Sequence, residues 1–198
     1  MIRVRLEIER LKTKFKYLNC IETGTIRSFH EKHESTRHIS EVISNSGHLK
    51  SLDIESKHIE ISKKICEGLS NIEWIECDSI EYLSKDTDKY HFVLLDSVND
   101  PNHIMAEFRL IANRVHVGGS IMIDDAGVDM EGNYTPNPEN INQAKKGWIV
   151  WEWCKSNGVD STIIMGGHST QILIPITENN KNIFGSKIRN RKTEDKIK

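Results

Sequence analysis

Residues 119–125 read GSIMIDD, and this stretch decides the fold class. A short apolar run follows two glycines and ends in Asp124 and Asp125. A second apolar run, FVLL at residues 92–95, ends the same way at Asp96. Such runs are typical of buried parallel strands, whose carboxyl ends meet at one edge of a sheet. The sequence therefore predicts that these three carboxylates gather at that edge, where they could bind a hard cation or a polar small molecule.

The composition is that of one globular domain. The chain has 198 residues, of which 37% are apolar and 28% charged, enough for a sizeable core. A net charge of -2 gives no basic excess for nucleic-acid binding, and no apolar stretch is long enough to cross a bilayer. The first residues mix charges from the start, unlike a signal peptide, and the four cysteines show no paired spacing. We expect a cytoplasmic protein with reduced thiols and no nucleic-acid or membrane partner.

Predicted strands and helices alternate along most of the chain. Strands are expected over residues 17–22, 48–54, 72–77, 90–96 and 119–124, and helices over 36–46, 56–69, 79–84 and 102–115, with Gly47 ending the first helix. A Trp-rich helix over 141–157 precedes two strands, 162–165 and 171–174, whose short connection predicts an antiparallel hairpin. The alternation predicts an α/β fold with a doubly wound, Rossmann-like sheet, mostly parallel with a terminal antiparallel hairpin.

The two ends of the chain carry different patterns. Residues 1–16 are predicted to form an amphipathic lead-in helix of a single domain that spans 1–177, and this helix could support a homodimer. Residues 178–198 are polar and rich in lysine, so we expect a flexible tail. The tryptophans at 148, 151 and 153 are expected to pack against the sheet rather than bind a ligand.

Polar residues follow three successive strands. Glu22-Thr-Gly-Thr25 comes after the first strand, where Gly24 would let a ligand approach the backbone. Asp53 ends the second strand, a position where an acid commonly accepts ribose hydroxyls, and Asp78 follows the third, where it could accept from an adenine amine. Each residue also has a simpler interpretation, since Gly24 could be an ordinary turn glycine and the two aspartates could cap helices.

Taken in order, these positions resemble the class I S-adenosylmethionine-dependent methyltransferases. The resemblance rests on the motifs after all five predicted strands and covers residues 15–176. It implies that S-adenosylmethionine is the cofactor and that its site includes Glu22, Gly24, Thr25, Asp53, Asp78 and Asp96. The loop after Gly24 departs from the pattern, because it is long, polar and contains His30 and His33.

A narrower resemblance concerns the three aspartates of the opening motif. Catechol-type, caffeoyl-CoA-type and macrocin-type O-methyltransferases hold a metal between an acid after the fourth strand and an acid pair after the fifth. The resemblance implies that Asp96, Asp124 and Asp125 bind Mg²⁺ or another divalent cation, which would lower the pKa of a substrate hydroxyl. Alternatively, Asp96 is only the usual strand-end acid and Asp125 caps the next turn.

A general base is less sharply indicated. His103 and His168 have a suitable intrinsic pKa, and both are predicted near the same sheet edge, although either could be a surface histidine. A metal-bound alkoxide would need no dedicated base. The polar segment 128–139 is expected to select the acceptor.

The predicted function is S-adenosylmethionine-dependent, cation-assisted O-methylation of a small hydroxylated acceptor. Two alternatives stay open, namely a metal-independent methyltransferase and a non-catalytic nucleotide-binding or scaffold protein of the same fold. A nicotinamide dehydrogenase fits less well, because the chain lacks the G-x-G-x-x-G fingerprint.

Overall fold

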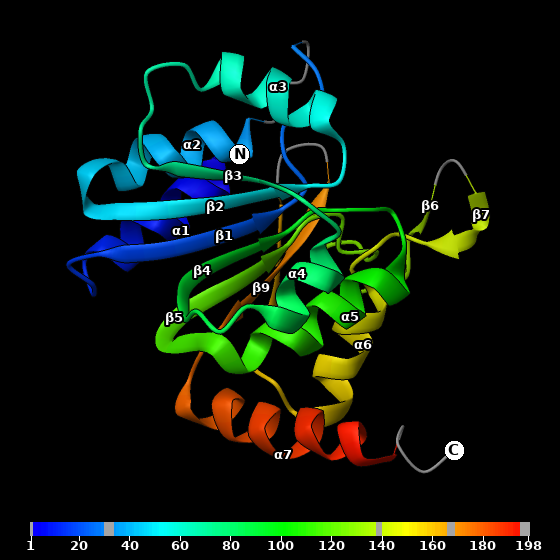
Figure 1. Ribbon diagram of the computed structural model, residues 1–198. Coiled ribbons are helices and arrows are strands. Elements are labelled where there is room, and N and C mark those ends of the chain that lie inside the picture. The colour runs from blue at the N-terminus through cyan, green and yellow to red at the C-terminus, as the bar shows by residue number, and fades with distance from the viewer. Residues whose placement is uncertain (1, 30–33, 138–139, 166–168, 195–198) are drawn as a thin grey trace.

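The computed structural model describes residues 2–29, 34–137, 140–165 and 169–194 (Figure 1). Within these residues, seven strands form one sheet in the order β3-β2-β1-β4-β5-β9-β8. The first five strands of that order are parallel, β9 runs antiparallel to β5, and β8 runs antiparallel to β9. The strands are β1 Leu18–Thr23, β2 Gly47–Asp53, β3 Ile72–Glu76, β4 Tyr90–Leu95, β5 Val115–Ile123, β8 Thr162–Met165 and β9 Thr170–Pro175. The predicted fold class is confirmed.

Helices cover both faces of this sheet (Figure 1). They are α1 Ile2–Lys12, α2 Ser35–Ile43, α3 Ser56–Ile65, α4 Ser79–Lys85, α5 Pro101–Ile111, α6 Trp148–Asn157 and α7 Glu178–Glu194. Two 3-10 turns, Ser44–Ser46 and Ala112–Arg114, extend α2 and α5. The strands β6 Pro136–Asn137 and β7 Asn140–Ala144 pair antiparallel in a separate two-stranded sheet. In the part of the chain that is described, no helix has both the length and the apolar character needed to span a membrane.

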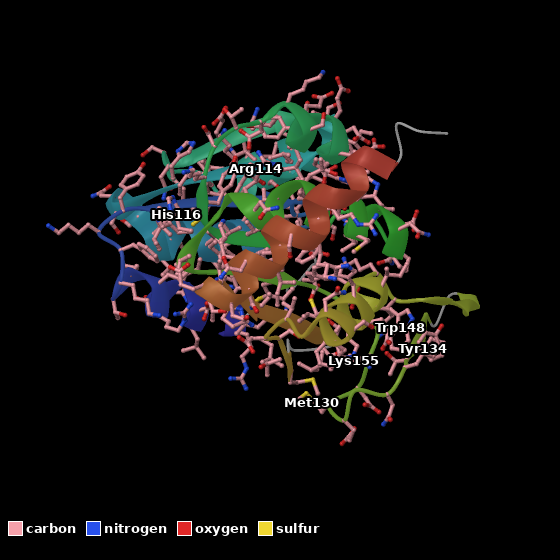
Figure 2. All side chains as sticks on the ribbon, turned by 90° about the horizontal axis from the view of Figure 1, so that it is seen from below. Arg114, His116, Met130, Tyr134, Trp148 and Lys155 are labelled. Atoms are coloured by element: carbon pink, nitrogen blue, oxygen red, sulfur yellow. The ribbon has the colours of Figure 1, made fainter. Side chains whose placement is uncertain are left out.

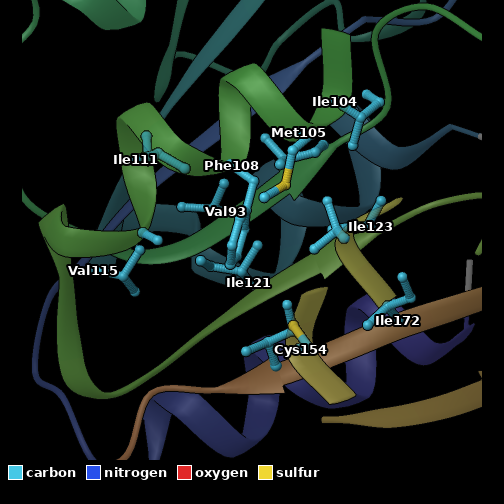
Figure 3. Close-up of a cluster of buried hydrophobic side chains, with 14 of the residues drawn as sticks. Val93, Ile104, Met105, Phe108, Ile111, Val115, Ile121, Ile123, Cys154 and Ile172 are labelled. Carbon is cyan, nitrogen blue, oxygen red and sulfur yellow. The ribbon is translucent and has the colours of Figure 1, made fainter. Parts of the chain in front are cut away.

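Successive side chains of each strand point to opposite faces of the sheet, so the core has two layers. Val93 and Ile121 face the layer under α5, where Phe108 packs on them (Figure 3). Phe92 and Met122, one position along each strand, face the opposite layer under α1 and α2. Side chains on both faces of β4 and β5 are therefore buried at residues 92–95 and 121–123, which explains why these segments are continuous apolar runs.

The predicted lead-in helix is present as α1, although it ends at Lys12 rather than residue 16. Val4, Ile8 and Leu11 recur at helical spacing and are fully buried in the layer that also contains α2. The apolar face of α1 therefore packs within its own chain.

The helix predicted over residues 141–157 is wrong in its first part. Residues 140–144 form β7, and the helix begins at Trp148 after Gly147. A backbone pairing with β6, which the local sequence does not reveal, replaces the first helical turns. Trp148, Trp151 and Trp153 are partly buried against the core, in agreement with their expected packing role.

The prediction of a flexible tail is wrong for residues 178–194, which form α7. Phe184 is fully buried, with ring centroids 5.6 Å from Phe108 and 6.1 Å from Trp153. The side chain of Asn180 donates to the carbonyls of Asp160 and Pro175. One aromatic anchor and one buried amide thus attach a largely polar helix to the domain.

Gly47 follows the last residue of the 3-10 turn that extends α2, so it ends this helical segment as predicted. It begins β2 in extended backbone, while Ser44 takes the positive φ of 43° at the helix end. A Cβ atom at residue 47 would lie 2.7 Å from the Leu18 carbonyl oxygen and 2.8 Å from Ile43 Cβ. The glycine therefore gives β2 room beside β1.

Candidate functional site

A pocket of about 420 Å³ opens at the carboxyl ends of the parallel strands. Its walls come from the segments that follow β1, β2, β3 and β4, together with the first turn of α5. The lining residues are Gly24, Arg27, Leu52, Asp53, Ile54, Glu55, His58, Cys77, Asp78, Ser79, Ser97, Val98, Asn99 and His103. This is the place where open α/β sheets bind ligands.

Gly24 holds the ends of β1 and β4 close together. Its φ is +82°, and a Cβ atom built there would lie 2.3 Å from the Asp96 carbonyl oxygen. Its amide donates to the Leu52 carbonyl of β2 at 2.8 Å. Only a residue without a side chain satisfies both conditions, so this glycine has a packing role in addition to lining the pocket.

Asp53 lines the pocket and also braces the loop after β1. Its carboxylate accepts from the amides of Thr25 at 3.1 Å and Glu55 at 2.9 Å, and lies 3.2 Å from His58 Nδ1. A carboxylate has about four acceptor positions, so these contacts leave little capacity for a ligand. Glu55, exposed on the same wall, is a second carboxylate that the sequence analysis did not single out.

Three of the predicted cofactor residues, Glu22, Thr25 and Asp96, do not line the pocket. Thr25 is buried, and its hydroxyl lies 3.1 Å from Thr36 Oγ1 and 2.7 Å from Ser62 Oγ. Glu22 is fully buried and accepts from Ser51 Oγ at 2.6 Å. Burial raises the pKa of Glu22 to about 7, although its hydroxyl donors oppose the shift. Thr25 thus joins the loop after β1 to α2 and α3, and Glu22 joins β1 to β2.

Two exposed apolar side chains face the same pocket. Ile54 follows β2 and is 63% exposed, and Val98 follows β4 and is 45% exposed. Exposed apolar side chains on two walls of one pocket are well suited to contact a flat ring. Neither residue is recognisable as functional in the sequence, because both look like ordinary apolar residues next to strand-end acids.

Asp78 lines the same pocket and also caps α4. Its carboxylate accepts from the Glu81 amide at 2.9 Å, which is the simpler interpretation considered above. Ser79, the next residue, lies 3.0 Å from His103 Nε2. A capping carboxylate that also lines a pocket can serve both purposes, because one of its oxygens is engaged by the helix.

His103 belongs to this cofactor-side wall. Its Nε2 lies 3.3 Å from the buried Glu107 carboxylate, and the hydrogen bond to Glu107 raises the pKa of His103 despite partial burial. A raised pKa leaves a smaller fraction of His103 in the neutral form that can take up a proton. His168, the other predicted base, lies outside the described residues.

Asp96, Asp124 and Asp125 are brought together at the sheet edge, as the opening motif predicts, but around a lysine. Lys146 Nζ pairs with Asp96 Oδ1 and lies 3.9 Å from Asp125 Oδ2. Asp124 Oδ1 instead accepts from Gln171 Nε2 at 2.8 Å and Ser169 Oγ at 3.3 Å. The Lys146 side chain is 3% exposed, against 25% for Asp96 and 31% for Asp125.

Burial and the neighbouring charges shift the pKa values of Lys146 and Asp96. Burial alone would lower the pKa of Lys146, but the charges of Asp96, Asp124 and Asp125 raise it above its usual value, so the ammonium stays charged. Burial raises the pKa of Asp96 to about 6; the charge of Asp124 adds to the rise and that of Lys146 opposes it.

The donor set does not fit the predicted divalent cation. Among the described residues, no three His, Cys, Asp or Glu side chains converge in a metal-binding arrangement. The ammonium of Lys146 takes one oxygen of Asp96, and the Gln171 amide takes one oxygen of Asp124. The predicted cation site is therefore not confirmed. Lys146 was not predicted as part of the site, and the local sequence marks it only by the adjacent Gly147.

Arg27 joins the two parts of the site. It donates to the backbone carbonyls of Asp96, at 3.0 Å, and Ser97, and it lines the pocket. It comes from the long polar loop after Gly24 in which the sequence departs from its resemblance. A cationic side chain is thus fixed where the cofactor pocket meets the aspartates.

The segment after the aspartate pair is anchored to α6. Tyr134 packs edge-on against Trp148 with ring centroids 5.0 Å apart, and Lys155 Nζ lies 6.0 Å from the Trp148 ring (Figure 2). Met130 is 49% exposed on the same segment. Residues 128–135 therefore form a partly apolar, aromatic-backed loop beside the aspartates.

Comparisons with known proteins support this architecture at the level of the fold. No protein-family model matches the chain, and no curated protein matches it significantly. Among solved structures, it is similar to a candidate caffeoyl-CoA O-methyltransferase from Staphylococcus aureus, with a TM-score of 0.66 and 16% identity over 88% of this chain and 83% of that one. The chain is also similar to the O-methyltransferase TomG from Streptomyces achromogenes, solved with SAM. The TM-score is 0.60 and the sequence identity 14%, over 89% of this chain and 80% of that one.

A third neighbour carries a different name. An rRNA methylase from Streptococcus thermophilus gives a TM-score of 0.63 at 11% identity, over 89% of this chain and 95% of that one. Identities this low establish the fold alone. The chain has the class I S-adenosylmethionine-dependent methyltransferase fold, as its resemblance implied, and the fold does not by itself select the acceptor.

Proposed function

We propose that this chain transfers a methyl group from S-adenosylmethionine to an oxygen atom of a small hydroxylated acceptor. The observation that carries the proposal is the pocket at the carboxyl edge of the sheet, which combines carboxylates with two exposed apolar side chains in a methyltransferase fold. The O-methyltransferases among its structural neighbours support oxygen as the methylated atom.

The pocket would bind the cofactor through complementary chemistry on its walls. Ile54 and Val98 would contact the two faces of the adenine, and Asp78 would accept from its amine. Glu55, with Asp53 behind it, would accept from the ribose hydroxyls. S-adenosylmethionine brings an already activated methyl group on its sulfonium, so the contribution expected of the chain is mainly positioning.

The acceptor would bind between the aspartates at the sheet edge and the loop of residues 128–135. Asp96 and Asp125 are the partly exposed members of their group and could accept a hydrogen bond from an acceptor hydroxyl. Residues 128–135, backed by Tyr134 and Trp148, would then limit the size and shape of the acceptor. Because the donor set does not fit a divalent cation, no step is assigned to one.

Cofactor binding can be tested by calorimetry with S-adenosylmethionine and S-adenosylhomocysteine. Replacing Ile54 with Ser removes most of its apolar contact with the adenine, which should weaken binding by about 1 kcal/mol, or about fivefold. Val117→Ser is the matched control, because Val117 is also exposed, at 41%, near the start of β5 and far from its carboxyl end.

Two results would contradict the proposal. Wild-type protein that binds neither form of the cofactor at high micromolar concentration would remove the methyltransferase assignment. Equal weakening by Ile54→Ser and Val117→Ser would remove the pocket as the binding site. Radiolabelled methyl transfer to a panel of small phenols, catechols and sugars would then identify the acceptor class.

A further inference from the structure

The lysine among the aspartates is held there by the backbone on both sides of it. The Gly147 amide donates to the Asp125 carbonyl at 2.9 Å, and a Cβ atom at residue 147 would lie 2.7 Å from Ala126 Cα. Gly127, with φ +78°, makes the reciprocal approach, since its Cβ would lie 2.9 Å from Trp148 Cβ. Two glycines thus bring residues 145–148 into contact with the end of β5, which fixes where Lys146 lies.

Contacts and backbone conformation also fix two of the aspartates near Lys146. Gln171 of β9 and Ser169 donate to Asp124, so this carboxylate is oriented without the lysine. Asp125 has a positive φ of 49°, an uncommon conformation that turns the chain at the end of β5. The ammonium therefore sits in a prepared position between Asp96 and Asp125 rather than at the end of a loose side chain.

The charges of the group decide what else can bind there. The group of three carboxylates already contains a cation, which is the buried ammonium of Lys146. Its Nζ pairs with an oxygen of Asp96 that a metal would need as a ligand. A divalent ion entering this group would be repelled by the ammonium at short range, where little water screens the charge. It would also compete with the Gln171 amide for Asp124.

We propose that Lys146 is a resident cation that replaces the divalent metal at this sheet edge, so that methyl transfer needs no metal. Lys146 is a positioning residue: it holds the carboxylates of Asp96 and Asp125 in place, and their exposed oxygens face the acceptor. The consequence for methyl transfer rests on the proposed function, whereas the consequence for metal binding does not.

Metal affinity, measured by Mn²⁺ calorimetry and electron paramagnetic resonance, tests this proposal without any activity assay. Wild-type protein should show no binding at this site up to about 1 mM Mn²⁺, whereas Lys146→Ala should bind at least about tenfold more tightly, because the oxygens of Asp96 and Asp125 become free. Asp124→Asn in the Lys146→Ala background should lower the gained affinity. Lys145→Met is the matched control, which removes a charge from the neighbouring position and should gain no Mn²⁺ binding.

A second variant covers the case in which Lys146→Ala fails to fold. Lys146→Met keeps the length of the side chain without its charge, and millimolar Mg²⁺ or Mn²⁺ should raise its melting temperature but not that of the wild type. Methyl transfer by the wild type should be unchanged by a chelator, and transfer by Lys146→Met should fall and recover in part with added metal.

The outcomes separate this inference from the proposed function. Micromolar Mn²⁺ binding by the wild type that Asp124→Asn abolishes would overturn it, as would loss of wild-type transfer to a chelator. Folded Lys146 variants that gain no metal affinity would also overturn it. Failure of S-adenosylmethionine to bind the wild type would instead remove the proposed function and leave the metal experiment interpretable.

Discussion

Gly24→Ala offers the sharpest test of how the pocket is built. The new methyl group would meet the Asp96 carbonyl oxygen at 2.3 Å and the carbonyl carbon at 2.8 Å, both of them backbone atoms that cannot rotate away. The ends of β1 and β4 would have to separate. This overpacking should cost about 1–3 kcal/mol, in addition to about 1–2 kcal/mol for placing alanine at positive φ.

Gly68→Ala separates these two costs. Gly68 has nearly the same φ, +87° against +82°, but nothing lies within 4 Å of its would-be Cβ. Gly68→Ala should therefore lower the free energy of unfolding only by the cost of the positive φ, about 1–2 kcal/mol. Gly24→Ala should lower it by about 2–5 kcal/mol. Urea unfolding measures both values, and calorimetry with S-adenosylmethionine should show weaker binding only for Gly24→Ala. Equal destabilisation by the two substitutions would refute the close approach of Gly24 to Asp96.

Three further predictions concern stability. Phe184→Ala should destabilise the protein by about 3–5 kcal/mol in thermal or urea unfolding, because its ring is fully buried; a change below about 1 kcal/mol would mean that α7 is not docked. Gly185→Ala, in the same helix with nothing within 4 Å, should instead stabilise by up to about 1 kcal/mol. For Glu22, burial raises the folded pKa from 4.5 to about 7, so the folded state holds the extra proton and stability falls as pH rises through that window. Glu22→Gln should flatten the pH dependence of stability between about pH 4.5 and 7 by up to about 3 kcal/mol, and an unchanged slope would contradict the assigned pKa.

The strand-end acids were predictable because their signal is local. A buried parallel strand is an apolar run of a few residues, and the residue that ends it lies at the sheet edge whatever the rest of the chain does. Asp53, Asp78, Asp96, Asp124 and Asp125 all lie at that edge for this reason.

The predictions for residues 140–144 and 178–194 were wrong because contacts between distant parts of the sequence determine both structures. Residues 140–144 form a strand because β6 pairs with them, and Phe184 is buried because Phe108 and Trp153 meet it from other helices. In both cases the local composition is polar and gives no warning. A partner distant in sequence supplies the stabilising contact.

The α/β class, the terminal antiparallel hairpin and the sheet edge where the acids gather could be predicted from residue patterns alone, since each follows from periodicity and strand ends. The lysine that lies among those acids could be located only from the folded chain. Lys146 lies 50 positions from Asp96, and two glycine contacts place its ammonium there. Charge pairing depends on distance in space rather than in sequence, so the group that resembles a metal site in the sequence contains its own cation in the fold.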